Sequence, residues 1–454
     1  MLVKILIAGN GKVGSTLARQ LSAEGYDLVL IDSDPRVLEG SEEQYDIMTL
    51  TGNCASMQTL READVEHADL LVACTGTDEV NLLCCMTAHQ LNPQIHTVAR
   101  IRDPEYVEQA YAMRHAFGLS MTFNPEKQAA EEIARLLKYP GFLKRESFAH
   151  GKVQLVELRV EEGSKICNVS LIDFSGIVKC QVLVCTVLRD GKAITPGGSF
   201  VLRAGDRIFV TATSDNLAIL LKSLGIVTHK VKNVLIAGGG MISYYLAQNL
   251  EKTSIYAHVL EKDYERCKKL ATLLPRTNVV CGDVVDQNFL ESEGLATYDA
   301  LASLTGSDEL NMVISLYGHT RDLPQIITKL NHVENSKITE TLPVGSVICP
   351  RKLCCNNIVR YVRAMQNQTG AALTIYSIAD GQAEAMEFEV DQTTKNCDVP
   401  LKRIKLKKNI LLVCITRGSQ IMFPNGDSTF QGGDRIVLVS SSEDVIMQLN
   451  DIFE

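Results

Sequence analysis

No tract of basic residues interrupts this sequence, and no apolar run reaches the length that crosses a bilayer. The 454 residues carry 45 Lys and Arg against 54 Asp and Glu, a formal charge of −9. An acidic chain without a basic patch binds a phosphate backbone poorly, so we expect no nucleic-acid partner. A spanning helix needs about 18 apolar residues in succession. We therefore expect no direct membrane insertion. The run Leu2–Ile7 is too short for a secretory signal, so we also expect a cytoplasmic protein.

Metal-ligand and redox spacings are also missing. No two cysteines are spaced C-x-x-C, and the nine histidines form no H-E-x-x-H pattern. These absences argue against a metal site and against a redox centre. Most of the fourteen cysteines lie within apolar runs, where we expect buried, reduced thiols. The cysteines in such runs include Cys74, Cys84, Cys85, Cys185, Cys281 and Cys414.

A glycine-rich turn follows the first apolar segment, Val3–Ala8. The turn is Gly9-Asn10-Gly11-Lys12-Val13-Gly14. In a dinucleotide site the first glycine permits a tight turn, the second lets the backbone approach a pyrophosphate, and the third allows helix and strand to pack closely. Asp32 ends the next strand-like run, at a separation typical of a carboxylate that accepts from ribose hydroxyls. Because this carboxylate repels a 2′-phosphate, the pattern favours NAD over NADP.

The same pattern occurs again in the second half of the chain. The second turn is Gly238-Gly239-Gly240-Met241-Ile242-Ser243. The glycine offset, 238 − 9 = 229, equals the offset of the acids, 261 − 32 = 229, where Glu261 answers to Asp32. Further on, the segment Thr75–Asn81 answers to Thr305–Asn311. One G-x-G-x-x-G is weak evidence, but strand, turn, helix, strand and acid repeated at one spacing indicate a duplication.

The order of strand-like and helical stretches predicts four domains. Alternating strands and helices near the N-terminus are typical of a doubly wound parallel sheet. Tyr139–Gly141 and the polar Lys144–Ser147 indicate a linker. After it, period-two alternation and the turn Gly205-Asp206-Arg207 indicate a small β-rich lobe, and Gly433-Asp434-Arg435 marks its repeat. We expect an α/β chain with two Rossmann-like doubly wound parallel sheets, each followed by a small β-rich α+β lobe, joined at Gly225–Lys232. The predicted domains are 1–140 and 230–368 for nucleotide binding, with lobes at 150–225 and 370–454.

An apolar stripe follows the helix start at Asn124-Pro125-Glu126. Ala129, Ile133 and Leu137 recur at helical spacing. Two interpretations stay open: the stripe is core, or it is a docking face for another subunit. In the second case Ile133→Glu disturbs assembly.

Over essentially its full length the chain resembles the peripheral NAD-binding regulatory subunits of Trk potassium uptake systems, which are tandem RCK (regulator of potassium conductance) proteins. The resemblance is carried by the glycine turns, Asp32, Thr75–Asn81, Val98–Pro104 and the two Gly-Asp-Arg lobes. It implies two clefts for NAD(H) and ATP or ADP. The first cleft would be lined by Gly9, Asn10, Gly11, Lys12, Val13, Gly14, Asp32, Asn53, Thr75, Gly76 and Arg100. The second would be lined by Gly238, Gly240, Met241, Ile242, Glu261, Asp283, Thr305 and Lys329.

The two halves depart from the family pattern in different ways. Asn53 stands where family members often carry aspartate, and Ser243 replaces the third glycine of the second turn. Met241 replaces the basic Lys12, and Lys329 takes the place of Arg100. Because a lost phosphate-facing charge weakens a triphosphate more than a diphosphate, we expect the two sites to differ in ligand preference.

The resemblance also implies a function. It indicates a subunit that assembles as a ring, a tetramer of chains, and gates a membrane-embedded Trk-type potassium-translocating partner. The chain would then lie at the inner face of the cell membrane through that partner. An NAD-dependent dehydrogenase would use the same turn and acid, but it needs a positioned proton donor or acceptor, and we find none, so we expect no catalytic residues and no enzyme. An NAD-sensing regulator of another process is a further alternative.

Individual residues have plainer interpretations as well. Arg100 could form a surface ion pair with Asp103 or Glu105, and Thr75 and Thr305 could be ordinary turn residues. These alternatives make no use of a ligand.

Overall fold

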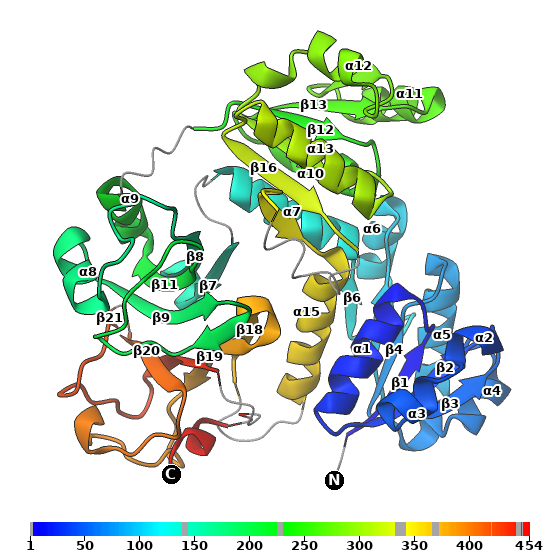
Figure 1. Ribbon diagram of the computed structural model, residues 1–454. Helices are drawn as coiled ribbons and strands as arrows, with labels where there is room; N and C mark the ends of the chain where they lie inside the picture. The colour runs from blue at the N-terminus through cyan, green and yellow to red at the C-terminus, as the bar shows by residue number, and fades with distance from the viewer. Residues whose placement is uncertain are drawn as a thin grey trace. The chain divides into compact units, whose positions relative to one another are not determined.

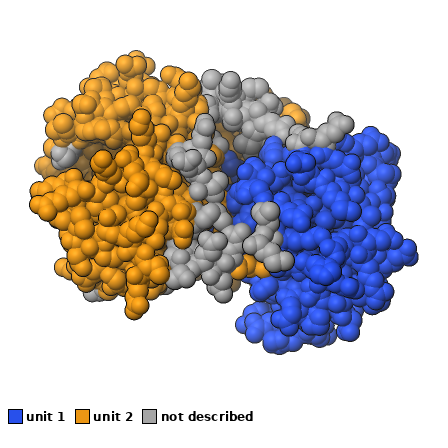
Figure 2. Space-filling model, turned by 90° about the horizontal axis from the view of Figure 1, so that it is seen from below, with its two compact units in different colours: residues 1–129, 349–362 blue, residues 130–348, 363–454 orange. Residues whose placement is uncertain are grey.

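The computed structural model describes residues 3–138, 144–224, 230–331, 342–365, 372–418, 420–441, 446 and 448–454. The first part of the predicted linker, 139–141, and most of the predicted joint, 225–229, lie outside the described residues. The second part of the linker prediction, Lys144–Ser147, is wrong, because these residues belong to a β-strand that pairs with the segment Val153–Glu157. The chain forms two compact units (Figure 2). Unit 1 comprises residues 1–129 and 349–362, and unit 2 comprises residues 130–348 and 363–454.

A six-stranded parallel sheet forms the centre of unit 1. Its strands are β1 (Lys4–Ala8), β2 (Asp27–Asp32), β3 (Met48–Thr51), β4 (Leu70–Ala73), β5 (His96–Arg100) and β6 (Met121–Phe123), in the order β3-β2-β1-β4-β5-β6. The helices are α1 (Lys12–Ala23), α2 (Pro35–Leu38), α3 (Ser41–Tyr45), α4 (Met57–Glu62), α5 (Asp78–Leu91) and α6 (Pro104–Ala112). The inner strands are continuously apolar because helices cover both faces. The strand order reverses between β1 and β4, which is where open sheets of this kind bind ligands.

Unit 2 contains a second sheet of the same design. Its strands are β12 (Asn233–Ala237), β13 (Tyr256–Glu261), β14 (Asn278–Cys281), β15 (Ala300–Ser303), β16 (Gln325–Lys329) and β17 (Ser346–Ile348), in the order β14-β13-β12-β15-β16-β17. The helices are α10 (Met241–Leu250), α11 (Tyr264–Leu273), α12 (Gln287–Ser292) and α13 (Asp308–Thr320). The identical strand order confirms the predicted duplication and the α/β class.

Two antiparallel lobes complete unit 2. The first has β7 (Lys144–Phe148), β8 (Val153–Arg159), β9 (Val182–Arg189), β10 (Lys192–Ile194), β11 (Arg207–Thr213), α8 (Leu171–Ile177) and α9 (Ser214–Leu224), in the strand order β10-β9-β11-β8-β7. The second has β18 (Thr374–Ile378), β19 (Ala383–Glu389), β20 (Ile410–Arg417), β21 (Gln420–Met422) and β22 (Arg435–Ser440), in the order β18-β19-β22-β20-β21. Short 3₁₀ turns occur at 65–67, 149–151, 295–297, 379–381, 401–403 and 449–452.

The two lobes share one hydrophobic core. Phe148 and Phe209 of the first lobe pack in the same cluster as Ile378 and Val439 of the second. Gln382 bridges the lobes as well, because its side-chain oxygen accepts from the main-chain N–H of Ala193 at 3.0 Å. The predicted lobes are therefore β-rich as expected, but they are packed against each other.

Helix α7 (Pro125–Lys138) resolves the two interpretations of the apolar stripe. Ala129, Ile133 and Leu137 are all buried within the chain. The second half of α7 belongs to unit 2, where the Leu136 carbonyl accepts from the Gln325 side chain of β16 at 2.9 Å. The stripe is core, and the docking-face interpretation is wrong.

Helix α15 (Pro350–Met365) shows the same exchange in the opposite direction, because most of it belongs to unit 1. It follows the second sheet in sequence, yet residues up to Val362 belong to unit 1, where it lies beside α1 (Figure 1). The Cys355 thiol donates to the Val13 carbonyl at 3.7 Å, and the Gln20 amide donates to Asn356 at 3.3 Å. Each helix that follows one sheet thus contributes to the unit that holds the other sheet.

The cysteines are free thiols, and nine of the fourteen are buried. Burial raises the pKa of the Cys74, Cys85 and Cys185 thiols to about 12, which keeps them protonated and unreactive. Cys281 departs from the prediction, because it is exposed. It lies at the end of β14, an edge strand, so one side of it faces solvent despite the apolar residues before it.

The Gly-Asp-Arg turn of each lobe anchors an arginine from a neighbouring hairpin. Asp206 is buried, and its two oxygens accept from Arg189 Nε at 2.8 Å and Nη2 at 2.7 Å. Asp434 binds Arg417 in the same way, at 2.9 and 2.7 Å. The repeated motif therefore has a structural role.

We expect Arg189→Ala to destabilise the first lobe by about 3–5 kcal/mol, because it leaves the Asp206 carboxylate buried without its cation. Since the chain has no tryptophan, unfolding is best followed by circular dichroism in denaturant. Lys192→Ala, on the exposed edge strand β10, is the matched control and should change little. Equal loss in both variants would contradict the role of the pair.

Candidate functional site

The first glycine turn has the geometry that its sequence predicts. Gly9 has φ +102°, a conformation that side chains disfavour. A Cβ added at Gly14 would lie 1.8 Å from the Gly9 carbonyl oxygen, so only glycine permits this packing. A Cβ at Gly11 would meet no atom within 4 Å, so Gly11 faces open space.

Both turns lead into helix N-termini that can receive an anion. Gly11 caps α1 and Gly240 caps α10, and within the described residues neither first turn has a side-chain cap or an acidic residue. The first main-chain N–H groups of each helix therefore remain available, and the helix dipole favours negative charge there.

The two acids hold their glycine turns in place. Asp32 accepts from the Asn10 N–H at 2.7 Å and from the Asp34 N–H at 3.0 Å. Glu261 accepts from the Gly239 N–H at 2.8 Å and from the Asp263 N–H at 2.9 Å. Each carboxylate oxygen still has a second lone pair that can accept from a ribose hydroxyl.

A buried asparagine connects the ends of two strands in the first cleft. Asn81 is fully buried, and its oxygen accepts from the Thr75 N–H at 2.8 Å and from the Thr75 hydroxyl at 2.7 Å. Its amide nitrogen donates to the Arg100 carbonyl at 2.9 Å. Asn81 therefore joins the end of β4 to the end of β5 through hydrogen bonds.

The Arg100 side chain forms an ion pair with Glu126 of α7, at 3.4 Å, and not with Asp103 or Glu105, the partners of the alternative interpretation. Its Nε is buried and has no hydrogen-bond partner within the described residues. An unsatisfied guanidinium N–H at the end of β5 is suited to an anionic ligand oxygen.

Other predicted residues of the first cleft have different positions. The Asn10 amide turns into the protein and donates to the Val37 carbonyl and, at 3.3 Å, to the Ser41 hydroxyl. The Val13 side chain is buried in the core, so only its backbone can face a ligand. Lys12, Asn53 and Gly76 are exposed, and the Asn53 oxygen accepts from the Ala55 N–H at 3.0 Å.

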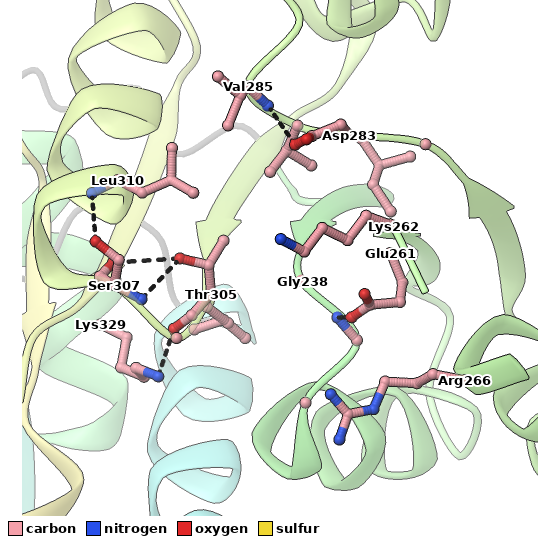
Figure 3. Close-up of a pocket in the computed structure, with 17 residues that line it drawn as sticks. Gly238, Glu261, Lys262, Arg266, Asp283, Val285, Thr305, Ser307, Leu310 and Lys329 are labelled. Atoms are coloured by element: carbon pink, nitrogen blue, oxygen red, sulfur yellow. Dashed lines mark hydrogen bonds between the residues drawn. The ribbon is translucent and has the colours of Figure 1, made fainter. Parts of the chain in front are cut away.

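The second cleft contains a cavity of about 430 Å³ at the carboxyl ends of the strands (Figure 3). Six of the predicted residues line it: Gly238, Gly240, Glu261, Asp283, Thr305 and Lys329. Met241 and Ile242 are not among the lining residues that the structure describes, and the Ile242 side chain is buried. Ile242 thus matches Val13 of the first cleft, whose side chain is also buried in the core.

The same hydrogen bonds join the ends of β15 and β16 in the second cleft, with one added contact. The Asn311 oxygen accepts from the Thr305 N–H at 2.8 Å and hydroxyl at 2.7 Å, and its nitrogen donates to the Lys329 carbonyl at 2.9 Å. The Lys329 ammonium donates to the Thr305 carbonyl at 2.6 Å. Thr75 and Thr305 thus make the same hydrogen bonds in the two clefts, and their contact with a ligand stays a prediction.

Ser243 fits the place of the third glycine by a different contact. The residue is fully buried, and its hydroxyl donates to the Gly238 carbonyl oxygen. A hydrogen bond here replaces the close packing that Gly14 provides in the first turn.

Two cations of the second cleft were missed in the sequence. Lys262 and Arg266 line the cavity on the same side as Glu261 (Figure 3). Lys262 directly follows the predicted acid, so a position-by-position comparison of the halves beyond the motifs would have found it. The second cleft therefore has two basic side chains beside its acid, at positions other than that of Met241, the counterpart of Lys12.

We expect Asn81→Ala to destabilise the first nucleotide domain by about 2–4 kcal/mol, because three hydrogen bonds are lost and buried groups are left unpaired. Hydrogen exchange should accelerate at the Thr75 amide and in the segment that follows Arg100. Gln90→Ala, at an exposed position of the same helix, is the control. Unchanged hydrogen exchange in Asn81→Ala would show that the hydrogen bonds of Asn81 are dispensable.

Two family models match the chain along the duplicated pattern. The TrkA-N domain matches residues 5–124 and 234–350, and the TrkA-C domain matches residues 155–225 and 385–453. The chain belongs to the TrkA family of potassium uptake proteins. The predicted family, regulatory and not enzymatic, is thereby confirmed, and the dehydrogenase alternative is set aside.

Curated relatives of the TrkA family match over their full length. A Trk system potassium uptake protein TrkA homolog of Archaeoglobus fulgidus is 33% identical over 451 residues, which cover 99% of this chain and 100% of that protein. The TrkA protein of Haemophilus influenzae is 27% identical, with 100% and 99% covered.

Solved structures share the fold. The GsuK RCK domain has a TM-score of 0.63 at 18% identity, with 98% of this chain and 93% of that chain covered. A GsuK channel bound to NAD has a TM-score of 0.62 at 19% identity, with 98% and 77% covered. Within the described residues, no helix has both the length and the apolarity to cross a membrane.

Proposed function

We propose that this chain is the regulatory subunit of a Trk-type potassium uptake system and that it senses adenine nucleotides, NAD(H) and ATP or ADP, in its two clefts. The observation that carries the proposal is the repeated site: a glycine turn, an open helix N-terminus and an acid at the switch point of each parallel sheet. The GsuK channel solved with NAD supports the same type of ligand for this fold. The residues assigned to the clefts are those predicted above.

The nucleotide would act by binding two conformations of the assembly with different affinity. A ligand shifts such an equilibrium only by its differential affinity, and by linkage the partner's state changes nucleotide affinity equally. Lys12 is exposed at the first residue of α1, where its ammonium can reach a γ-phosphate that ADP lacks. Phosphate number is therefore the discriminator that we propose for the first cleft.

The chain would form a ring of four copies, bind a membrane-embedded potassium-translocating subunit, and lie at the inner face of the membrane through that subunit. The domain boundaries at 1–140, 150–225, 230–368 and 370–454 stay predictions.

Calorimetry with NADH, NAD, ATP and ADP tests the proposal on the intact chain. We expect two binding events per chain, and the loss of one in Asp32→Ala, because the acid holds the first turn and faces the ribose. Asp27→Asn, at the exposed start of the same strand, is the control that should retain both. Absence of binding by every adenosine compound, or rapid turnover of NADH with a metabolite, would overturn the proposal.

A further inference from the structure

Two basic side chains flank the acid of the second cleft. Lys262 follows Glu261 directly, and Arg266 lies on the first turn of α11. Both are exposed and both line the cavity, on the side opposite Thr305 and Ser307 (Figure 3). A ligand whose ribose lies at Glu261 would therefore lie next to these two cations.

The first cleft has no charge at the corresponding positions. With the offset of 229, Lys262 answers to Ser33 (262 − 33 = 229) and Arg266 answers to Val37 (266 − 37 = 229). The alignment is supported by the helix caps, because Asp34 caps α2 and Asp263 caps α11 through their side chains. The two clefts therefore differ in charge beside the acid, where the ribose is expected.

The acid and the lysine on the far wall already have partners. Glu261 is only 8% exposed, and each of its oxygens accepts from a main-chain N–H. The Lys329 ammonium is held by the Thr305 carbonyl. Lys262 and Arg266 are thus the lining cations next to the acid, and the repulsion that Glu261 would exert on a nearby phosphate is reduced by its hydrogen bonds and by these cations.

We propose that the second cleft accepts an adenine nucleotide with a phosphate on its ribose 2′-oxygen, the NADP(H) class, through Lys262 and Arg266. This inference rests on the proposed function, since it assigns a ligand class to one of the two nucleotide sites. Basic residues beside the acid position are the means by which dinucleotide sites of this fold accommodate a 2′-phosphate. The first cleft, with Ser33 and Val37, keeps the unphosphorylated ribose.

Three small probes isolate the 2′-phosphate: AMP, adenosine 2′,5′-bisphosphate and ADP. ADP carries the same number of phosphates as the bisphosphate but places the second on the 5′ chain. Because a charge-assisted hydrogen bond contributes on the order of a tenfold change in affinity, we expect the bisphosphate to bind the second cleft at least about tenfold more tightly than AMP. NADPH should likewise bind it more tightly than NADH.

The decisive variant gives the second cleft the residues of the first, Lys262→Ser with Arg266→Val. We expect this variant to lose the tenfold preference for the bisphosphate and to keep its affinity for AMP and ADP. Lys269→Ser, which removes an exposed charge from the same helix outside the cavity, should leave the preference intact. The reciprocal Ser33→Lys should create a preference in the first cleft.

The outcomes separate this inference from the proposed function. If NADH and ATP as well as AMP, ADP and the bisphosphate all fail to bind either cleft, the nucleotide function itself is wrong. If AMP and ADP bind but the bisphosphate shows no preference, the inference is wrong and the function stands. If the double variant weakens ADP as much as the bisphosphate, the two cations serve the 5′-phosphates, which also overturns the inference.

Discussion

Gly14→Val is expected to prevent the first glycine turn from folding and to abolish nucleotide binding there. The added Cβ would lie 1.8 Å from the Gly9 carbonyl oxygen and 3.2 Å from the Cys74 sulfur. The Gly9 backbone must move on one side and the Cys74 side chain must give way on the other, at a cost of about 3 kcal/mol or more. Thermal unfolding followed by circular dichroism, together with calorimetry using NADH, measures both losses.

Gly11→Ala is the matched control within the same turn. A Cβ there meets no atom within 4 Å, and Gly11 has φ −71°, which alanine adopts freely. This variant should fold normally, yet it should bind nucleotide more weakly because the methyl group keeps a pyrophosphate away from the backbone. A Gly14→Val protein as stable as Gly11→Ala would contradict the packing role.

Ile133→Glu is expected to destroy the fold of unit 2 and not merely to alter assembly. The side chain is fully buried on α7. Burying an unpaired carboxylate costs on the order of 5 kcal/mol. We expect aggregation or a sharply lowered melting temperature, measured on the soluble fraction and by circular dichroism.

Lys127→Glu introduces the same charge at an exposed position of the same helix and should remain folded. Size-exclusion chromatography with light scattering then compares the masses of the two variants. A folded Ile133→Glu protein of reduced mass would restore the docking-face interpretation of the stripe.

Local sequence patterns predicted the sheets well. Gly9, Gly14 and Asp32 act on residues close to them in the chain or in the adjacent strand, so their spacing carries the geometry. Repetition of that spacing at Gly238 and Glu261 made the second parallel sheet predictable as well, whereas the strand order is known only from the structure.

Long-range partners were not predictable in the same way. The stripe at Ile133 showed that one face is apolar, but helical spacing does not say which element covers it. Arg266 belongs to no motif, and only the fold places it in the cavity, whereas Lys262 directly follows the predicted acid in sequence. Cys281 has apolar neighbours in sequence, and its exposure follows from the position of β14 at a sheet edge.

The crossed placement of α7 and α15 has a consequence for the origin of the chain. A fragment that ended after the first lobe would keep α7 but lack α15, and it would expose both an apolar helix and the surface that α15 covers. Two such fragments could cover these exposed surfaces by exchanging helices with each other. The tandem chain keeps within one polypeptide an exchange of helices that separate halves would have to make between two molecules, and we expect an isolated half to expose apolar surface as a monomer.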